Sequence, residues 1–148
     1  MSAAPNEAVV RATVGERFSR EVTLTPALVA AFSQAAGDDN PIHFDPAHAA
    51  TTRFKRVIAS GTHTSSLLLG LTATHFATRG AVVGLEFTVM FRRAVFADEH
   101  VRIEWDVIKV TPNAKLGGEI VDMLGRLLGQ DGLPSVEAKG RVLVTAKL

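Results

Sequence analysis

The chain has no cysteine among its 148 residues. A disulfide framework and a thiolate nucleophile are therefore both excluded, and a reducing compartment suits such a composition. The chain also has no apolar run long enough to span a bilayer, and residues 1–7 lack the apolar centre of a secretory signal peptide. We accordingly expect a soluble, cytoplasmic protein with no membrane partner.

The chain also has no marked excess of positive or negative charge: it contains 16 basic and 15 acidic residues, and its formal charge is +1. Such a balance does not predict a nucleic-acid partner. Hydrophobic residues make up 47% of the chain, and no linker, repeat or low-complexity tract divides it. A chain of this length can bury a core without a disulfide or a metal, so we predict one domain over residues 1–148.

The first half of the chain has mainly helical periodicity. Apolar residues alternate over residues 18–24, which predicts one short strand. Thr25 and Pro26 then predict the start of a helix, because threonine caps helices and proline is favoured at their first position. We expect a short helix over residues 46–51 and a longer one over residues 65–76. The longer helix is apolar on nearly every side, so we predict that other elements surround it.

The second half changes to a period of two residues. Alternating apolar and polar residues predict strands over residues 83–91, 101–107, 120–128 and 136–148, with a hairpin turn at residues 130–132. Because the connections are short, we expect these four strands to be antiparallel neighbours. The predicted fold class is α+β, with an antiparallel β-sheet wrapped around a central apolar helix.

One loop brings acidic groups and an imidazole together. Pro41 disfavours helical backbone at Asn40, so the preceding helix should end near Gly37. Asp38 and His43 then both lie on the loop and can face the same space. A carboxylate and an imidazole that share one water can position it and take its proton, because the histidine pKa of about 6.5 is near neutral pH.

The same loop also has a purely structural interpretation. Aspartates such as Asp38 and Asp39 often form turns. Asn40 followed by Pro41 favours the start of a turn, and His43 would then be an ordinary loop residue. Residue types alone leave both interpretations open.

A longer pattern around this loop resembles a known family. Residues 37–43 read Gly-Asp-Asp-Asn-Pro-Ile-His and match the motif Gly-Asp-x-Asn-Pro-x-His throughout. The similarity continues through residues 44–46, 49–51 and 58–64, and more loosely from Leu85 onward. On these residues the chain resembles the MaoC-like, (R)-specific enoyl-CoA hydratases, also called the hydratase 2 family. The resemblance implies the hot-dog fold, in which a sheet curls around a central helix.

The resemblance also implies roles for individual residues. Asp38 and His43 would activate one water, which adds to C3 of a trans-2-enoyl thioester while C2 receives a proton. Gly61, at the start of the central helix, would lend its backbone N–H to the thioester oxygen, and an amide at a helix N-terminus can stabilise such an oxygen. Asn40 and Pro41 would support the loop.

Neighbouring residues are expected to contact the substrate. His63 lies just inside the central helix, where it can face the acyl group or act as a structural donor. Thr62 stands where some relatives carry a large side chain, and it therefore bears on the width of the acyl pocket. Basic side chains can meet the phosphates of coenzyme A or remain solvated surface charges. They are Arg53, Lys55, Arg56, Arg92 and Arg93.

Cofactors and partners follow from the same comparison. No cofactor is expected, because coenzyme A enters as part of the substrate. His48, His75 and His100 lack partners at metal-ligand spacing, so no metal site is predicted. Single hot-dog domains generally pair by joining their sheets, so the resemblance implies a homodimer.

The leading hypothesis is a hydro-lyase that reversibly hydrates a trans-2-enoyl-CoA to the (R)-3-hydroxyacyl-CoA. One alternative is an acyl-CoA thioesterase on the same fold, in which water attacks the thioester carbonyl. Another is a non-catalytic acyl-CoA-binding module, because a fold alone does not fix a function.

Overall fold

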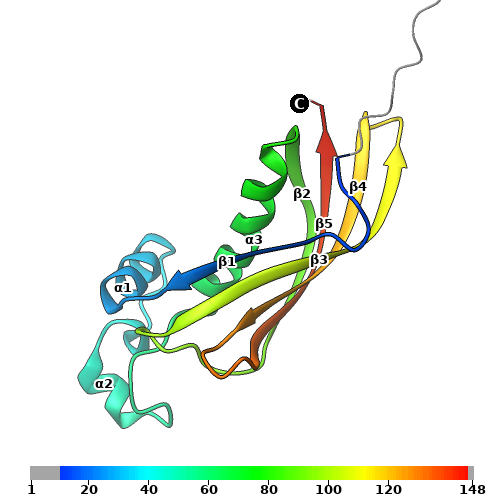
Figure 1. Ribbon diagram of the computed structural model, residues 1–148. Coiled ribbons are helices and arrows are strands. Elements are labelled where there is room, and N and C mark those ends of the chain that lie inside the picture. Colours follow the sequence, from blue (N-terminus) through cyan, green and yellow to red (C-terminus); the bar gives the residue numbers. More distant parts are fainter. Residues whose placement is uncertain (1–10, 147–148) are drawn as a thin grey trace, which may run out of the picture.

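The structure is a computed structural model and describes residues 11–146. It contains a five-stranded antiparallel sheet with the long helix α3 against its concave face (Figure 1). The elements are β1 (Arg17–Thr23), α1 (Pro26–Ala35), the 3-10 helix η1 (Pro41–His43), α2 (Pro46–Thr51), α3 (Gly61–Ala77), β2 (Ala81–Phe91), β3 (His100–Asn113), β4 (Gly118–Leu128) and β5 (Pro134–Thr145). The predicted α+β class is confirmed, whereas residues 147–148 of the last predicted strand lie outside the described residues.

The strand order is β1-β3-β4-β5-β2. Strands β3, β4 and β5 are consecutive neighbours, as predicted, but the expectation that β2 pairs with β3 is wrong: β2 pairs with β5 at the far edge. Residues 92–99 do not form a hairpin, because their backbone bonds to the segment before α3 instead. The N–H of Ala59 donates to the carbonyl of Val95 at 2.7 Å, and that of Ala97 donates to Val57 at 3.1 Å.

A β-bulge in β2 changes which of its side chains face the core, compared with the prediction. The alternation in the sequence placed Val83, Leu85 and Phe87 on one face, but the register with β5 shifts between Gly84 and Glu86. Before the bulge Gly84 is opposite the buried Val142, and after it Phe87 is opposite Gly140. Leu85 is the extra residue and is 46% exposed. One inserted residue therefore reverses the facing of the strand on its N-terminal side.

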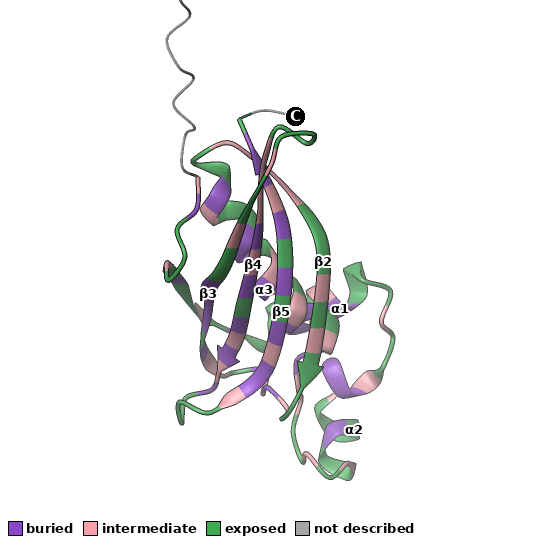
Figure 2. Ribbon diagram, turned by 90° about the vertical axis from the view of Figure 1, so that its right-hand side faces the viewer, coloured by how far each residue is buried: buried purple, intermediate pink, exposed green. Residues whose placement is uncertain are grey.

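The core lies between the concave face of the sheet and α3. Buried and exposed residues alternate along the strands (Figure 2). Trp105 at the centre of β3 is fully buried, and its indole N–H donates to the carbonyl of Leu68 in α3 at 2.9 Å. A Cβ at Gly125 would lie 2.5 Å from the Trp105 ring, so a glycine is required there. The other fully buried side chains of this core include Ile103, Val107, Val121, Met123, Leu127 and Val136.

Helix α3 packs against the sheet and α1 but remains exposed along one side, so the prediction that other elements surround it is confirmed only in part. Leu68, Leu71 and Phe76 are buried under the sheet. The opposite side exposes a row of small residues to solvent. They are Thr62, Ser66, Gly70, Ala73 and Ala77. No helix within residues 11–146 is long and apolar enough to cross a membrane.

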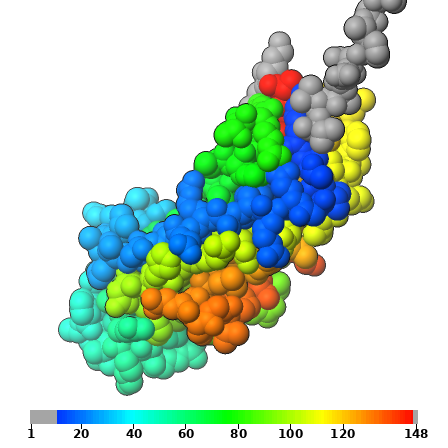
Figure 3. Space-filling view, viewed as in Figure 1, coloured from blue at the N-terminus to red at the C-terminus, as the bar shows by residue number. Residues whose placement is uncertain are grey.

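The helices that precede α3 gather at its N-terminal end. Figure 3 shows this segment, coloured light blue to teal, at one end of the molecule. The predicted cap at Thr25 is confirmed, because its side chain accepts a hydrogen bond from the N–H of Leu28. Asp45 caps α2 in the same way and accepts from the N–H groups of its first turn. Helix α1 ends at Ala35, and Gly37 follows with a φ of 73°. The loop that carries Asp38 is thereby directed toward the start of α3.

Candidate active site

Asp38 is held by the last turns of α1. The Ser33 hydroxyl is buried and donates to the carbonyl of Asp38 at 2.5 Å, while the N–H of Asp38 donates to the carbonyl of Ser33 at 2.9 Å. Gly37 allows this reversal because its positive φ is strained for other residues. The backbone of Asp38 is thus fixed, and its side chain remains 30% exposed.

The following residues turn the chain so that His43 faces Asp38. The side-chain oxygen of Asn40 accepts from the N–H of Ile42 at 3.3 Å and caps the 3-10 turn Pro41–His43. One carboxylate oxygen of Asp38 accepts from the N–H of Asn40 at 3.1 Å. Its other oxygen lies 3.3 Å from Nε2 of His43.

The tautomer of His43 follows from its second contact. Nδ1 lies 2.8 Å from the carbonyl oxygen of Ile58, and a carbonyl can only accept, so Nδ1 carries a hydrogen. In the neutral ring Nε2 is then a bare acceptor that faces a carboxylate, which is also an acceptor. A donor such as water can satisfy both groups at once. The side chain of His43 is only 8% exposed, so its partners fix its orientation.

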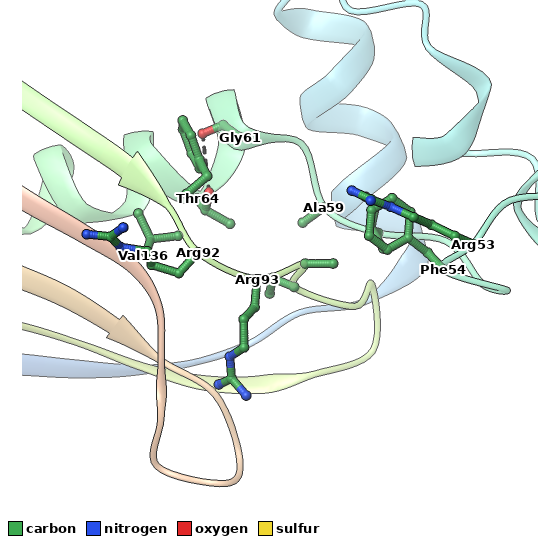
Figure 4. A pocket seen from close by; sticks show the side chains of 12 residues that line it. Arg53, Phe54, Ala59, Gly61, Thr64, Arg92, Arg93 and Val136 are labelled. Carbon is green, nitrogen blue, oxygen red and sulfur yellow. Dashed lines mark hydrogen bonds between the residues drawn. The ribbon is translucent and has the colours of Figure 1, made fainter.

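Gly61 is the first residue of α3, and its N–H has no acceptor within the helix. It lines a cavity of about 440 Å³ together with Phe91, Ile58 and Thr64 (Figure 4). The remaining wall is mostly apolar, with three guanidinium groups. It is formed by Arg53, Phe54, Ala59, Arg92, Arg93, Ala94, Val95 and Val136.

Asp38 and Gly61 line two different hollows. Asp38 lies with Asp39 and Phe44 in a second hollow of about 350 Å³, against α1. Ile58 links the two, because its carbonyl binds His43 and the residue also lines the cavity at Gly61. A ligand that reaches both the free amide and the Asp38–His43 pair must therefore extend past Ile58.

His63 packs beneath this region, and Thr62 points away from it. The His63 ring is 6% exposed and stacks on Phe32 of α1 with ring centroids 4.3 Å apart. Its Nδ1 has no hydrogen-bond partner among the described residues, and burial lowers the pKa of the ring. His63 is therefore neutral at pH 7 and connects α1 to α3, while Thr62 is exposed on the open side of α3.

Three of the five predicted phosphate-binding cations already have acidic partners, and Arg92 and Arg93 are two of them. Arg92 lies 2.9 Å from Glu137, and Arg93 pairs with Asp131 at 2.6 Å, which raises the pKa of Arg93. Figure 4 shows the Arg93 side chain extending toward the β4–β5 hairpin. Both residues line the cavity, but neither guanidinium is free of a carboxylate.

The other three cations follow α2. Arg56 lies 3.6 Å above the Phe96 ring and 3.7 Å from Asp98. Arg53 lies above the Phe54 ring at 4.8 Å, and Lys55 is exposed with a φ of 67°. Within the described part of the chain, no carboxylate lies within 4 Å of Arg53 or Lys55. These two cations are the ones available to an anionic ligand.

Sequence reasoning missed three contributors to this site. Ser33, Ile58 and Phe91 act through position alone, as a buried hydroxyl, a backbone carbonyl and an exposed ring. No local pattern distinguishes them from ordinary helix, loop and strand residues. Within residues 11–146, no group of three or more His, Asp or Glu side chains is arranged to hold a metal ion.

Comparisons with known proteins identify the family of this chain. Residues 9–122 match the model of the MaoC-like domain family. The (R)-specific enoyl-CoA hydratase of Aeromonas caviae is 36% identical over 107 residues, which cover 72% of this chain and 75% of that protein. A 3-hydroxybutyryl-CoA dehydratase of Methylorubrum extorquens is 32% identical over 87 residues, which cover 59% of this chain and 55% of that protein.

Solved structures show the same fold. The (R)-hydratase from A. caviae superposes with a TM-score of 0.82 at 30% identity, over 90% of this chain and 97% of that one. An unliganded (R)-hydratase from Pseudomonas aeruginosa gives a TM-score of 0.81 at 28% identity, over 90% and 83% of the two chains. The hot-dog arrangement expected from the sequence is thus confirmed. The chain belongs to the MaoC-like dehydratase family.

Proposed function

We propose that this protein reversibly hydrates a trans-2-enoyl-CoA to the (R)-3-hydroxyacyl-CoA. The observation that carries the proposal is the contact of 3.3 Å between Nε2 of His43 and Oδ2 of Asp38. Because Nδ1 of His43 is committed to Ile58, the facing atoms form a pair of acceptors that one water beside them can bridge. Relatives that act as hydratases and dehydratases support the choice of reaction.

In the proposed reaction, Asp38 and His43 hold a water, and its oxygen forms a bond to C3 of the substrate. The proton that the water loses passes to the pair, and a proton is delivered to C2, so the product contains all the atoms of enoyl thioester and water. Electron density moves to the thioester oxygen in the transition state. The N–H of Gly61, at the N-terminus of α3, stabilises that oxygen. No electrons are exchanged with the protein, so the reaction requires no redox cofactor.

The coenzyme A moiety would extend from Gly61 into the cavity lined by Ile58 and Val136. We assign its phosphates to Arg53 and Lys55, because these cations lack a carboxylate partner in the described structure, whereas Arg92 and Arg93 have one. Guanidinium and ammonium groups bind phosphate through charge-assisted hydrogen bonds.

We also propose that the protein is a homodimer. The small residues on the open side of α3 lie beside β2, whose outer edge has no partner strand in the described chain. A Cβ at Gly70 would contact nothing within 4 Å, so Gly70→Glu should leave the protomer folded and place a charge on this surface. Sedimentation should give a dimer for the wild type and a monomer for the variant. A monomeric wild type would refute the proposal.

The reaction is tested with crotonyl-CoA. Hydration removes the enoyl absorbance, and chiral analysis should identify (R)-3-hydroxybutyryl-CoA as the product. Release of free thiol, measured with butyryl-CoA as well, would instead indicate a thioesterase. Calorimetric binding with neither change would indicate a binding module, and either of these results would overturn the proposed function.

A further inference from the structure

Phe91 has an unusual position for an aromatic side chain. It is the last residue of β2, and 58% of its surface is exposed. Its ring nevertheless lies directly on Gly61: a Cβ built on that glycine would be 2.9 Å from Cε1 and 3.0 Å from Cζ of the ring. One part of the ring therefore covers the start of α3, while the rest faces the cavity that both residues line.

The ring lies beside the free amide of Gly61. In a helix the Cα–Cβ bond tilts toward the N-terminus, and the unpaired N–H groups of the first turn point the same way. A ring that occupies the Cβ direction of Gly61 is thus next to the N–H of that residue. A group that accepts from this amide thus approaches the side of Gly61 that the Phe91 ring covers.

The positions of the two hollows indicate which part of the ligand contacts Phe91. Asp38 lies with Phe44 in the hollow against α1, whereas Phe91 lines the cavity that contains Arg53. In a thioester held at Gly61, the reacting carbons must extend toward Asp38. The sulfur and the first atoms of the thiol arm must then extend toward Phe91.

We propose that Phe91 is a substrate-contacting residue that holds the thioester group itself, on its thiol side, against the amide of Gly61. This inference rests on the proposed function for the identity of the ligand. Sulfur next to an aromatic ring is a favourable contact, and the exposed part of the ring gains from being covered. Phe91 therefore acts on the group that all substrates share, while Arg53 and Lys55 act on the phosphates.

Truncated substrates separate these two contributions. Crotonyl-CoA, crotonyl-pantetheine and the crotonyl thioester of N-acetylcysteamine share the thioester, but only the first carries the adenosine phosphates. Phe91→Ala should lower kcat/KM about tenfold for all three thioesters. The double substitution Arg53→Ala and Lys55→Ala should lower it for crotonyl-CoA alone, mainly through KM. A Phe91→Ala loss confined to crotonyl-CoA, or no loss, would overturn the inference.

Met90→Ala is the matched control. Met90 precedes Phe91 on the same strand, is also exposed, and lines a hollow on the opposite face of the sheet with Leu124 and Glu137. Its truncation removes a similar apolar surface without touching Gly61, so all three kcat/KM values should stay within about twofold of the wild type. A loss equal to that of Phe91→Ala would show a general effect of trimming β2 and would overturn the inference.

Gly61→Ala tests the contact itself. The substitution keeps the amide N–H, but its methyl group displaces the Phe91 ring, so the Gly61→Ala and Phe91→Ala losses should not multiply in the double variant. Losses that multiply would contradict the inference.

A binding measurement separates this inference from the proposed reaction. Butyryl-N-acetylcysteamine is saturated and cannot be hydrated, and calorimetry should show about tenfold weaker binding to Phe91→Ala than to wild type or Met90→Ala. If this result holds while crotonyl-CoA is not hydrated, the proposed function fails and the role of Phe91 stands. Equal binding to wild type and Phe91→Ala, or no binding to any of the proteins, would overturn the inference.

Discussion

Two carboxylate–imidazole pairs lie near the two ends of α3, and they are built differently. Glu16 hydrogen-bonds His75 in the last turn of the helix, and the pair is closed by Arg79, whose guanidinium nitrogens lie 2.8 and 2.7 Å from the two Glu16 oxygens. The His75 ring is further stacked on Phe18 at 3.8 Å. Both oxygens of the Glu16 carboxylate are therefore bound by donors from the protein.

Asp38 and His43 have no third charged partner. Their facing atoms are 3.3 Å apart, and no cation among the described residues lies within 4 Å of Asp38 other than the His43 ring. Asp38 also borders a hollow, whereas Glu16 is only 15% exposed and its partner His75 packs against the rings of Phe18 and Phe76. Residue types alone therefore do not distinguish the pair closed by Arg79 from the pair that we propose binds water. The number of donors already in place does.

The largest expected effect concerns turnover. Asp38→Asn keeps the size of the side chain but removes the carboxylate to which we assign general base catalysis, so hydration of crotonyl-CoA should fall by about 10² to 10⁴. The melting temperature should change little, because asparagine keeps an oxygen that can accept from the N–H of Asn40, and only the weak contact to the His43 ring changes.

Glu16→Gln is the matched control, because it makes the same carboxylate-to-amide change in the closed pair. It should leave kcat within about twofold of the wild type. Equal losses of turnover in Asp38→Asn and Glu16→Gln would erase the distinction between the two pairs.

The order of the two substitutions should be reversed for stability: Glu16→Gln should destabilise the protein more than Asp38→Asn. Burial raises the pKa of Glu16, but hydrogen bonds from Arg79, His75 and the N–H of Thr13 outweigh it and lower the pKa from 4.5 to about 2. Such a shift corresponds to roughly 3 kcal/mol of stability near neutral pH, part of which glutamine keeps through its own hydrogen bonds. Urea unfolding at pH 7 should therefore show a loss of about 2 kcal/mol for Glu16→Gln and less than about 0.5 kcal/mol for Asp38→Asn.

The pH dependence of the unfolding free energy tests the same contribution of Glu16. Since the pKa of Glu16 is lowered on folding, its contribution is complete above the unfolded value of 4.5 and is lost as the pH falls through about 2. The difference in unfolding free energy between wild type and Glu16→Gln should therefore shrink between pH 5 and pH 2. A difference that stays constant over this range would show that the carboxylate charge is not what stabilises the closed pair.

The smallest expected effect is on the support of Asp38. Ser33→Ala removes the hydroxyl that fixes the Asp38 carbonyl, at a cost of about 1 kcal/mol in unfolding free energy. The carboxylate then becomes less well positioned, so kcat should fall several-fold with KM little changed. Unchanged kcat with lowered stability would mean that the backbone of Asp38 needs no such support.

Much of the fold was predictable because it depends on local patterns. Thr25, Pro26 and Gly37 bound α1 as expected, and the alternation around Trp105 placed β3 correctly. The position of β2 was not predictable, since residues 92–99 bond to the segment before α3, which is a long-range choice. The bulge at Leu85 was hidden for a similar reason, because the strand continues the same alternation through it.

In the candidate site, too, the local contacts were predictable from the sequence and the long-range contacts were not. The spacing within the loop predicted that Asp38 and His43 could meet, and the structure places them in contact. Their catalytic roles and that of Gly61 stay predictions. The sequence could not show that Ile58 sets the tautomer of His43, or that acidic partners occupy Arg92 and Arg93, because these contacts join residues 15 to 45 positions apart.

The most direct measurement of the central claim follows the oxygen of the water. Crotonyl-CoA is incubated with the enzyme in ¹⁸O-labelled water, and the products are separated and their masses are measured by mass spectrometry. The account predicts one label in the 3-hydroxyacyl group still joined to coenzyme A, formed by wild type and Glu16→Gln and nearly absent with Asp38→Asn. Label in a free carboxylate, or an undiminished yield from Asp38→Asn, would contradict it.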